Sequence, residues 1–383
     1  MTGSLRQRGT NSWELRVYAG VDPDTGRKRF VTRTVRGSRR EALIELKMFA
    51  AQVALPRRRA LNTTFEELFE QWYEIAAPGW AINTQRHTRS VIDVHLVPRF
   101  GHLAVGELTT ADIDAFYADL RDHGGRDGRG LADGTVHRIH GVFRRALSQA
   151  VRWEWVWTNP AEHACPPVAV QREIFSPPPA AVARLLAATH DLPGLHAFFC
   201  VAVSTGARRG QLCALRWSDI DFDRNAVSFA RSLAEGPAGA VQIVATKNRK
   251  RNRVEIDNAT LNELRRHYDH VETSAKSAGV ELAPGAYVFA RDVEGLSPWR
   301  PNWVTKEFVR LRADNGLAGH RLHDLRHFMA TEMLAAGVAI PVVAARLAHS
   351  RASTTLNVYA HAVPGGDRDA ADGLADLLRR SAG

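Results

Sequence analysis

The sequence predicts an α+β, mainly helical protein of several domains. At 383 residues the chain exceeds one ordinary domain, and a hydrophobic content of 45% is enough for several packed cores. Amphipathic helical patterns with capping residues fill its middle, and short strand patterns occur near the N-terminus and after residue 219. We expect a small hairpin-plus-helix module over 1–55, an all-helical domain over 62–163 and a mixed domain with a small antiparallel sheet over 174–383.

Most of the net charge of +10 lies near the N-terminus. Up to Ala60 there are fourteen Lys and Arg against five Asp and Glu, whereas the rest of the chain has thirty-seven against thirty-six. Such a basic segment predicts a polyanionic partner. Nucleic acid is favoured over a membrane, because no apolar run reaches the roughly 18 residues of a spanning helix.

The three cysteines, Cys165, Cys200 and Cys213, are far apart and show no C-x-x-C spacing. The sequence therefore predicts neither a disulfide framework nor a zinc site. The first ten residues lack the apolar core of a signal peptide, and we expect a cytoplasmic protein.

Strand patterns and a capping motif define the N-terminal module. Trp13, Leu15 and Val17 alternate with polar residues, and the turn sequence DPDTG leads to a second alternating run, RFVTRTV, which together predict a hairpin. Ser38 and Glu41 form a capping box that begins a helix. The expected apolar stripe of that helix is Leu43, Leu46, Phe49, Ala50 and Val53.

The outer face of the hairpin is expected to carry Arg16, Arg29 and Arg33. A two-stranded ribbon fits the major groove of DNA, so these arginines predict a DNA-binding face; the alternative is a solvated basic surface. The sequence LPRRRALN at 55–62 is interpreted as a basic linker.

A second capping box, Thr64 with Glu67, opens the all-helical domain. Further helices are expected over 84–96, 110–121 and 135–152, and the cluster Trp153, Trp155 and Trp157 is expected to pack at the domain end. A proline-rich linker is expected over 166–179. The first helix should bury Phe65, Leu68, Phe69 and Trp72. Basic residues that face either a phosphate backbone or solvent are Arg86, His87, Arg89, His137, Arg138, Arg144 and Arg145.

The mixed domain is expected to begin with helices over 180–189 and 194–204. The segments VSFA, VQIVATK and RVEI then predict a three-stranded antiparallel patch. Arg208 follows Thr205 and Gly206 at an expected helix start, where unpaired N–H groups favour phosphate, although a surface arginine is common there. Lys247 lies in a basic turn with Lys250, and it is either a general acid toward DNA or one of several solvated cations.

The stretch 320–361 concentrates His323, Arg326, His327, His349 and Tyr359, groups that can bind phosphate, move a proton and act as a nucleophile. His323 and Arg326 are three residues apart and are expected to share one helix face. The spacing of His323 and His327 also matches a zinc helix, but Arg326 between them would repel the ion. The opposite face is expected to be a buried stripe of Leu325, Phe328, Met329 and Met333.

The end of this stretch predicts two more helices. Gly337 should end the first helix, Pro341 should lie in the first turn of the next, and Ser353 should cap a last short helix that carries Tyr359. A tyrosine in such a place is usually a packing residue, so its interpretation as a nucleophile depends on the residues around it.

Taken in order, TGARRG, LRWSDID, TK, HDLRH, LAHS and TTLNVYAH resemble the motifs of the tyrosine recombinases, specifically the phage-type integrases. The resemblance covers the mixed domain closely. Less specifically, the all-helical domain resembles the core-site DNA-binding domain of that family, and the N-terminal module resembles its arm-type DNA-binding module.

The resemblance implies a site-specific DNA recombinase that integrates or excises a mobile element. It implies a homotetramer on double-stranded DNA attachment sites that needs no metal, ATP or other cofactor. Whether an accessory directionality or DNA-bending factor is a further partner stays open. The implied catalytic residues are Arg208, Lys247, His323, Arg326, His349 and Tyr359.

Each of these residues has an implied role. Arg208 and Arg326 bind the phosphate, and Tyr359 forms a 3′-phosphotyrosyl link whose energy suffices to rejoin the strand. The resemblance further makes Lys247 the general acid toward the 5′-hydroxyl. It makes His323 an acid/base and His349 a hydrogen-bond donor to phosphate.

Gln211 departs from the family pattern, which usually has Glu or Asp three residues after the first arginine. If that side chain only orients its neighbours by accepting hydrogen bonds, an amide oxygen can replace the carboxylate; if its charge matters, activity should be lower. Gln211 therefore leaves open a DNA-binding regulator of the same fold. A type IB topoisomerase is a third hypothesis, which the N-terminal module disfavours. The terminal Leu374, Leu377 and Leu378 can dock on a neighbouring protomer or on the same chain.

Overall fold

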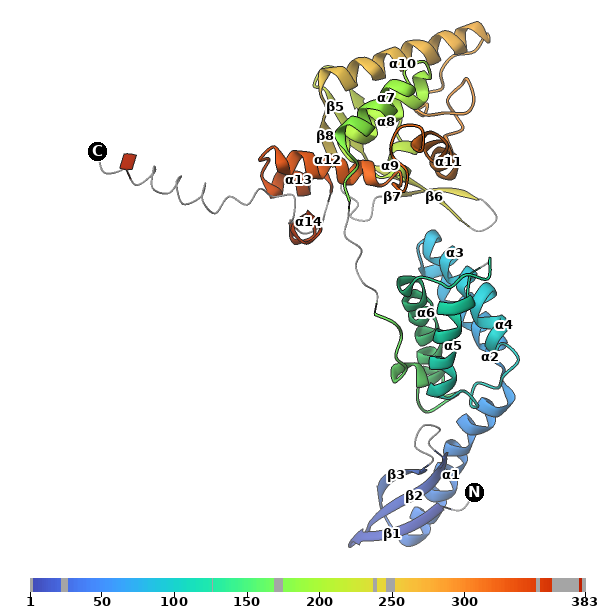
Figure 1. The fold of residues 1–383 in the computed structure, drawn as a ribbon. Coiled ribbons are helices and arrows are strands. Elements are labelled where there is room, and N and C mark those ends of the chain that lie inside the picture. The colour runs from blue at the N-terminus through green and yellow to red at the C-terminus, as the bar shows by residue number, and fades with distance from the viewer. Residues whose placement is uncertain are drawn as a thin grey trace. The chain divides into compact units, whose positions relative to one another are not determined.

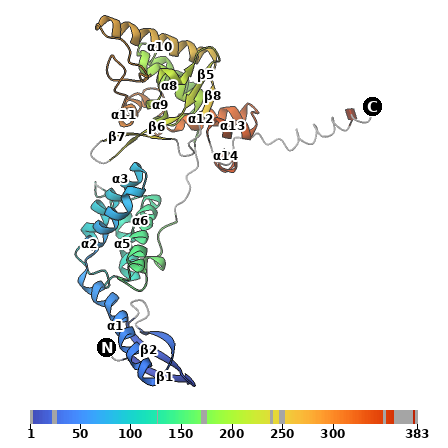
Figure 2. The ribbon, with the colours of Figure 1, turned by 180° about the vertical axis from the view of Figure 1, so that it is seen from behind.

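The computed structural model describes residues 3–21, 27–125, 127–168, 175–236, 240–245, 252–348, 352–359 and 379–380. The chain divides into two compact units, Met1–Arg172 and Glu173–Gly383. Most elements are helices and the sheets are small and antiparallel, which confirms the predicted α+β, mainly helical class (Figures 1 and 2). None of the described helices is long and apolar enough to cross a membrane.

A three-stranded antiparallel sheet opens the first unit, with strands β1 (Gly3–Gly9), β2 (Ser12–Val21) and β3 (Lys28–Arg36) in that order. The predicted hairpin corresponds to β2 and β3. Strand β1 was not predicted, because its sequence GSLRQRG has Leu5 as its one large apolar residue. Leu5 pairs with Leu15 across the sheet, so β1 forms by pairing with β2 and has no apolar alternation of its own that would predict a strand.

The predicted outer-face arginines were wrong for Arg29 and Arg33. Arg33 pairs with Leu15, which is fully buried, and cross-strand partners share a face. Its guanidinium carbon lies 4.4 Å from the ring centre of Phe49 on the covering helix. Arg29 is four residues from Arg33 and therefore lies on the same side of the strand. Arg16 does lie on the opposite face, where it sits 4.0 Å over the ring of Phe30.

Helix α1 (Arg39–Asn62) covers the sheet. The predicted capping box is confirmed: Glu41 Oε2 accepts the backbone N–H of Ser38 at 2.7 Å, and Ser38 Oγ accepts the N–H of Glu41 at 3.3 Å. The predicted linker at 55–62 was wrong, since the backbone there continues the helix. The alanine, leucine and arginine residues of this segment are strong helix formers. The run of charged arginines suggested a linker and obscured that propensity. The core between sheet and helix consists of Leu15, Val17, Leu46, Phe49 and Val53.

The remainder of the first unit is helical, as predicted. The capping box at its start is confirmed, with Thr64 Oγ1 accepting the N–H of Glu67 at 3.3 Å and Glu67 Oε2 accepting the N–H of Thr64 at 2.9 Å. Trp153 and Trp155 pack with ring centres 5.0 Å apart, whereas Trp157 is 39% exposed and does not join them in the core. The elements are α2 (Phe65–Ala76), α3 (Ile82–Val91), a π-helical turn (Ile92–Leu96), α4 (Val97–Phe100), α5 (Thr110–His123), α6 (Asp133–Arg152) and 3-10 turns at Ala77–Gly79 and Pro160–Glu162.

The second unit has a large apolar core around α8, whose Phe198 and Phe199 are fully buried. The two helices predicted at its start are confirmed within a residue. Its helices are α7 (Pro179–Ala188), α8 (Pro193–Thr205), α9 (Arg209–Cys213), a 3-10 turn (Trp217–Asp219), α10 (Asn258–Ser277), α11 (Pro301–Arg312), α12 (Asp324–Ala335), α13 (Ile340–Arg346) and α14 (Ala352–Tyr359).

The predicted three-stranded patch has a different composition. Its members β5 (Ala226–Phe229) and β8 (Asn252–Glu255) pair with each other, and β4 (Ile220–Asp221) completes that sheet. The third predicted member, β7 (Val241–Ala245), pairs instead with β6 (Arg231–Glu235) in a separate two-stranded ribbon. A single residue, Ala230, separates β5 from β6, so the chain passes directly from one sheet to the other.

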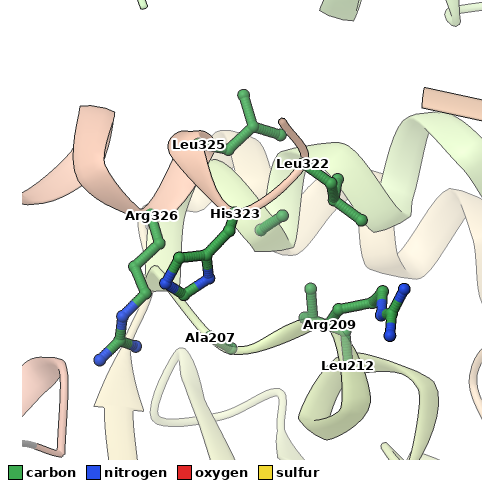
Figure 3. A pocket seen from close by; sticks show the side chains of 8 residues that line it. Ala207, Arg209, Leu212, Leu322, His323, Leu325 and Arg326 are labelled. Atoms are coloured by element: carbon green, nitrogen blue, oxygen red, sulfur yellow. The ribbon is translucent and has the colours of Figure 1, made fainter. Parts of the chain in front are cut away.

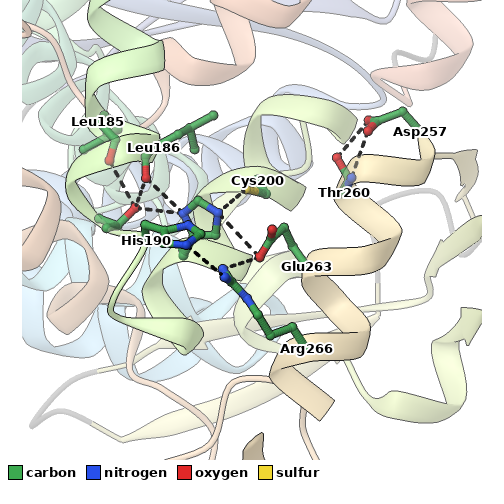
Figure 4. A network of polar contacts seen from close by, with 10 residues as sticks. Leu185, Leu186, His190, Cys200, Asp257, Thr260, Glu263 and Arg266 are labelled. Atoms are coloured by element: carbon green, nitrogen blue, oxygen red, sulfur yellow. Dashed lines mark hydrogen bonds and ion pairs between the residues drawn. The ribbon is translucent and has the colours of Figure 1, made fainter. Parts of the chain in front are cut away.

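A network of polar contacts around the buried His196 joins α7, α8 and α10 (Figure 4). The ring of His196 is bonded through Nδ1 to the carbonyl of Leu186 at 3.0 Å, and its Nε2 lies 3.5 Å from Glu263 Oε2. Glu263 also pairs with Arg266. The Sγ of Cys200 lies 3.6 Å from His196 Nε2, but burial raises the pKa of this thiol to about 12, which leaves it protonated and unreactive. The network is therefore structural.

Candidate active site

The turn between α8 and α9 allows two distant segments to meet. Gly206 has φ of +62°, and a Cβ at this position would lie 2.2 Å from Met329 Cε and 3.6 Å from Arg326 Cγ. Glycine thus serves both the left-handed conformation and the close approach of α12. As predicted, Arg208 lies directly before the next helix, although α9 spans only five residues.

Gln211 orients the start of α9. Its Oε1 accepts the backbone N–H of Arg208 at 3.0 Å, and its side chain is 6% exposed. An amide oxygen is therefore sufficient for this contact, which needs an acceptor rather than a charge. The neighbouring Arg209 donates to Thr305 Oγ1 at 2.5 Å. Arg208 itself is exposed, and partial burial of its guanidinium lowers its pKa.

Arg326 joins α12 to both flanking segments. Its Nη1 donates to the carbonyl of Gly206 and its Nη2 to the carbonyl of Leu347, each at 2.6 Å. The residue is 5% exposed, so α12 is buried at Arg326 as well as along the predicted stripe. Burial, and then the positive charge of Arg208, lowers the pKa of Arg326 to about 10. The guanidinium remains charged at neutral pH.

Helix α12 is covered on more sides than the sequence suggested, because it lies between α8 and α13. The predicted stripe was wrong for Phe328 and Met333, which are half-buried, and Leu334 is buried in their place. Gly337 ends the helix with φ of +80°, and Pro341 lies in the first turn of α13, as predicted. The residues buried along α12 are Asp324, Leu325, Arg326, His327, Met329, Ala330 and Leu334.

His323 lies directly before α12, and its ring points to the same side as Arg326, toward the loop that carries Ala207 (Figure 3). These residues line a small pocket between α8, α9 and α12. Although the residue is exposed overall, the partial burial of its ring, followed by the charges of His327 and the two arginines, lowers the pKa of His323 to about 4. His323 is therefore neutral near pH 7 and able to accept a proton.

Tyr359 is the last residue of α14 and is 1% exposed. Its hydroxyl lies 2.6 Å from His327 Nδ1. Burial raises the pKa of Tyr359 to about 12, although the charge of Arg326 acts in the opposite direction. The ring packs in an apolar cluster with Met329, Ala330, Leu334, Val343 and Leu347.

Arg346 was not singled out from the sequence, yet it connects three segments of the site. Its Nη2 donates to the carbonyls of Ser204 at 2.7 Å and Glu255 at 2.9 Å, while its own carbonyl accepts from Asn252 Nδ2 at 3.0 Å. The end of α8, strand β8 and helix α13 are thereby joined. A basic residue in an amphipathic segment gives no sign of such a role.

Four predicted site residues lie near one another: His323 and Arg326 line one pocket, the charge of Arg208 lowers the pKa of both, and the charge of Arg326 lowers that of Tyr359. Ser353 lies inside the first turn of α14 rather than at its cap, so that prediction was wrong. The predicted site residues Lys247 and His349, and the terminal Leu374, Leu377 and Leu378, lie outside the described residues.

Two family models match the chain. Residues 179–364 match the phage integrase family, and residues 64–121 match the N-terminal SAM-like domain of phage integrases.

The chain belongs to the phage integrase family.

Curated relatives of this integrase include proteins named integrase and tyrosine recombinase. It is 25% identical to the ICEBs1 integrase of Bacillus subtilis over 98% of its own length and all of the relative. It is 30% identical to a XerC-like tyrosine recombinase of Caldanaerobacter subterraneus, over 48% of this chain and 50% of that one. The predicted activity is confirmed: the chain is a tyrosine-type site-specific recombinase of the integrase kind.

Solved structures share the fold. The Tn1549 transposon integrase in complex with transposon right end DNA matches with a TM-score of 0.64 at 17% identity, over 82% of this chain and all of that one. A lambda integrase tetramer bound to a Holliday junction matches with a TM-score of 0.55 at 18% identity, over 92% of this chain and 94% of that one. The multidomain architecture is therefore that of known integrases.

Proposed function

We propose that this integrase cleaves and rejoins DNA with Tyr359 as the nucleophile and with Arg208 and Arg326 as the groups that hold the scissile phosphate. The observation that carries the proposal is the bond from Arg326 to the carbonyl of Gly206, which brings α12 next to the segment that presents Arg208. Two guanidinium groups can bind both non-bridging oxygens of a phosphodiester and stabilise the added charge of its transition state.

The proposed reaction exchanges one phosphate ester for another. The Tyr359 oxygen attacks phosphorus, the bond from phosphorus to the 5′ oxygen breaks, and a 3′-phosphotyrosyl link forms. The phenol proton passes to a base, and an acid gives a proton to the departing 5′ oxygen. Because the number of ester bonds is unchanged, a 5′-hydroxyl of another strand can reverse the reaction and rejoin the DNA.

His323 is proposed as the proton acceptor. It is neutral near pH 7 in the free protein because its pKa is lowered to about 4. Phosphate bound between the two arginines would add negative charge beside the ring, raise its pKa and strengthen it as a base. Lys247 as the general acid and His349 as a phosphate donor are proposed from the family motifs alone.

The proposed partner is double-stranded DNA at two attachment sites. We assign arm-type binding to 1–55, core-site binding to 62–163 and catalysis to 174–383, and we propose a homotetramer in the cytoplasm with an accessory directionality or bending factor. The assembled form is supported by the lambda integrase tetramer on a Holliday junction, whose fold this chain shares.

The proposal is tested by incubating the integrase with nicked duplex that spans the end of the element encoding it. Cleavage next to a nick loses a short fragment and traps the covalent intermediate, which migrates as a protein–DNA adduct on a denaturing gel. We expect an adduct with the unaltered protein and none with Tyr359→Phe. DNA binding without any adduct would favour a regulator, and relaxation of plasmid that lacks the site would favour a topoisomerase.

A further inference from the structure

The roles proposed above do not use the contact between His327 and Tyr359. The hydroxyl of Tyr359 lies 2.6 Å from Nδ1, inside the cluster formed by α12, α13 and α14. His327 is 9% exposed, and burial lowers its pKa, so its ring is neutral near pH 7. In the tautomer with the proton on Nε2, Nδ1 accepts the phenolic O–H.

This arrangement separates the hydroxyl from a DNA backbone. Arg208 is exposed and can meet a duplex directly, whereas Tyr359 is 1% exposed and its hydroxyl is turned toward His327. An attacking oxygen must come within about 3.5 Å of phosphorus. A phosphate of a stiff duplex cannot reach a hydroxyl that is enclosed in this way, so Tyr359 must move before it reacts.

We infer that His327 is a positioning residue: its Nδ1 holds the hydroxyl of Tyr359 in the enclosed arrangement of the free protein, and this hydrogen bond breaks before the tyrosine attacks DNA. The inference rests on the proposed function for the second of these steps. The first step concerns the free protein alone and can be tested without DNA.

The alternative role for His327, that of the base, conflicts with its surroundings. Burial raises the pKa of Tyr359 to about 12 and lowers the pKa of His327. Both shifts favour the neutral pair over the ion pair that proton transfer would form. His327 thus accepts a hydrogen bond in this arrangement and does not remove the proton.

The hydrogen bond predicts how a substitution of His327 changes the rate of adduct formation. In the unaltered protein this bond must break before Tyr359 is released, which slows the release by a factor of about two to ten. His327→Phe keeps a planar ring but removes the acceptor, so it should form the covalent adduct about two- to tenfold faster than the unaltered protein. His327→Asn places an amide oxygen near the position of Nδ1 and should remain within about twofold of it.

The experiment measures single-turnover adduct formation on the nicked duplex for the full chain and both variants, with thermal melting as a check on folding. Faster adduct formation by His327→Phe and restoration by His327→Asn support the inference. Equal rates, or a slower His327→Phe with unchanged melting, would overturn it. If the unaltered protein forms no adduct, the proposed function fails instead.

A second readout is independent of cleavage. Tyrosine labelled with ¹³C at Cζ reports ionisation by NMR, and the Tyr359→Phe spectrum identifies the Tyr359 signal among the six tyrosines. The hydrogen bond to Nδ1 stabilises the protonated phenol, so its loss in His327→Phe should lower the Tyr359 midpoint, although burial still keeps it above the ordinary value; His327→Asn should leave it in place. An unchanged midpoint in His327→Phe would contradict the inference. Should that variant not fold, saturating DNA must lower the midpoint in the unaltered protein, and a constant midpoint would equally contradict it.

Discussion

The two halves of the candidate site differ in how accessible their proposed functional side chains are in the free protein. At the α8–α9 turn, Arg208 is exposed, and Gln211 accepts the backbone N–H of Arg208. At the α12–α14 cluster, Arg326 and Tyr359 are buried and bonded to other protein groups. The comparison teaches that one of the two proposed phosphate-binding arginines is accessible in the free chain, whereas the other and the proposed nucleophile are enclosed. Substitutions on the two sides should therefore fail in different ways.

The largest effect is expected from Arg326→Ala. Adduct formation should fall by at least about 10²- to 10³-fold, because a donor to the transition state is lost. The carbonyls of Gly206 and Leu347 would also lose their donors and a cavity would remain, which should lower the free energy of unfolding by about 2–4 kcal/mol. Adduct assays and urea denaturation measure the two losses. Unchanged stability would show that the buried half is not held together by this side chain.

Arg208→Ala is the matched comparison on the exposed side. The same loss of about 10²- to 10³-fold in adduct formation is expected, since the second phosphate-binding guanidinium is removed. Its free energy of unfolding should stay within about 0.5 kcal/mol, as for other exposed substitutions. A large loss of stability here would erase the difference between the two halves.

Gly206→Ala should act on the contact between the halves. The added methyl group needs a left-handed backbone and meets Met329 Cε at 2.2 Å. We expect the free energy of unfolding to fall by about 1–3 kcal/mol, with reduced adduct formation even at temperatures where the variant is folded. Gly337→Ala has a similar φ of +80° but nothing within 4 Å of the added Cβ. It should cost less, and equal costs for the two variants would remove the argument for close approach.

Substitution of Gln211 should have a smaller effect. Gln211→Glu keeps the acceptor for the N–H of Arg208 and should match the unaltered protein in stability within about 0.5 kcal/mol. Gln211→Leu removes the acceptor and should cost about 1 kcal/mol in denaturation experiments. If Gln211→Glu raises adduct formation more than tenfold, charge at this position matters beyond orientation.

The last prediction concerns the dependence of stability on pH. The pKa of His323 is about 4 in the folded chain against an ordinary value near 6.5, so the unfolded chain binds the proton more tightly. The stability that the neutral ring contributes is present above pH 6.5 and is lost as the pH falls toward 4. His323→Gln should therefore show a weaker decline of melting temperature between pH 6.5 and 4. An identical decline in both proteins would show that His323 does not contribute to the loss of melting temperature in acid.

Local chemistry made parts of this fold predictable. The capping boxes at Ser38 and Thr64 were evident because each depends on residues three positions apart. The linker at 55–62 and the pairing of β7 were not, since a proline and a charge run concealed a helix, and strand pairing depends on where neighbouring segments pack. The candidate site was predicted mainly from motif order, because no single residue in it is unusual.

The contacts that decide how the site behaves could not be predicted. The sequence indicates that His327 adjoins Arg326, but its bond to Tyr359 depends on α13 folding back to place α14 beside α12. The same fold buries Arg326 against Leu347. These are consequences of tertiary packing between segments more than twenty residues apart, and periodicity along one helix does not contain them.

The most direct test of the central claim is to map the covalent link itself. The adduct formed on nicked duplex is digested with nuclease and protease, and the peptide that retains nucleotide is sequenced by tandem mass spectrometry. The account predicts that the 3′-phosphate of the retained nucleotide is esterified to the phenolic oxygen of Tyr359. Attachment to any other residue, with Tyr359 unmodified, would contradict it.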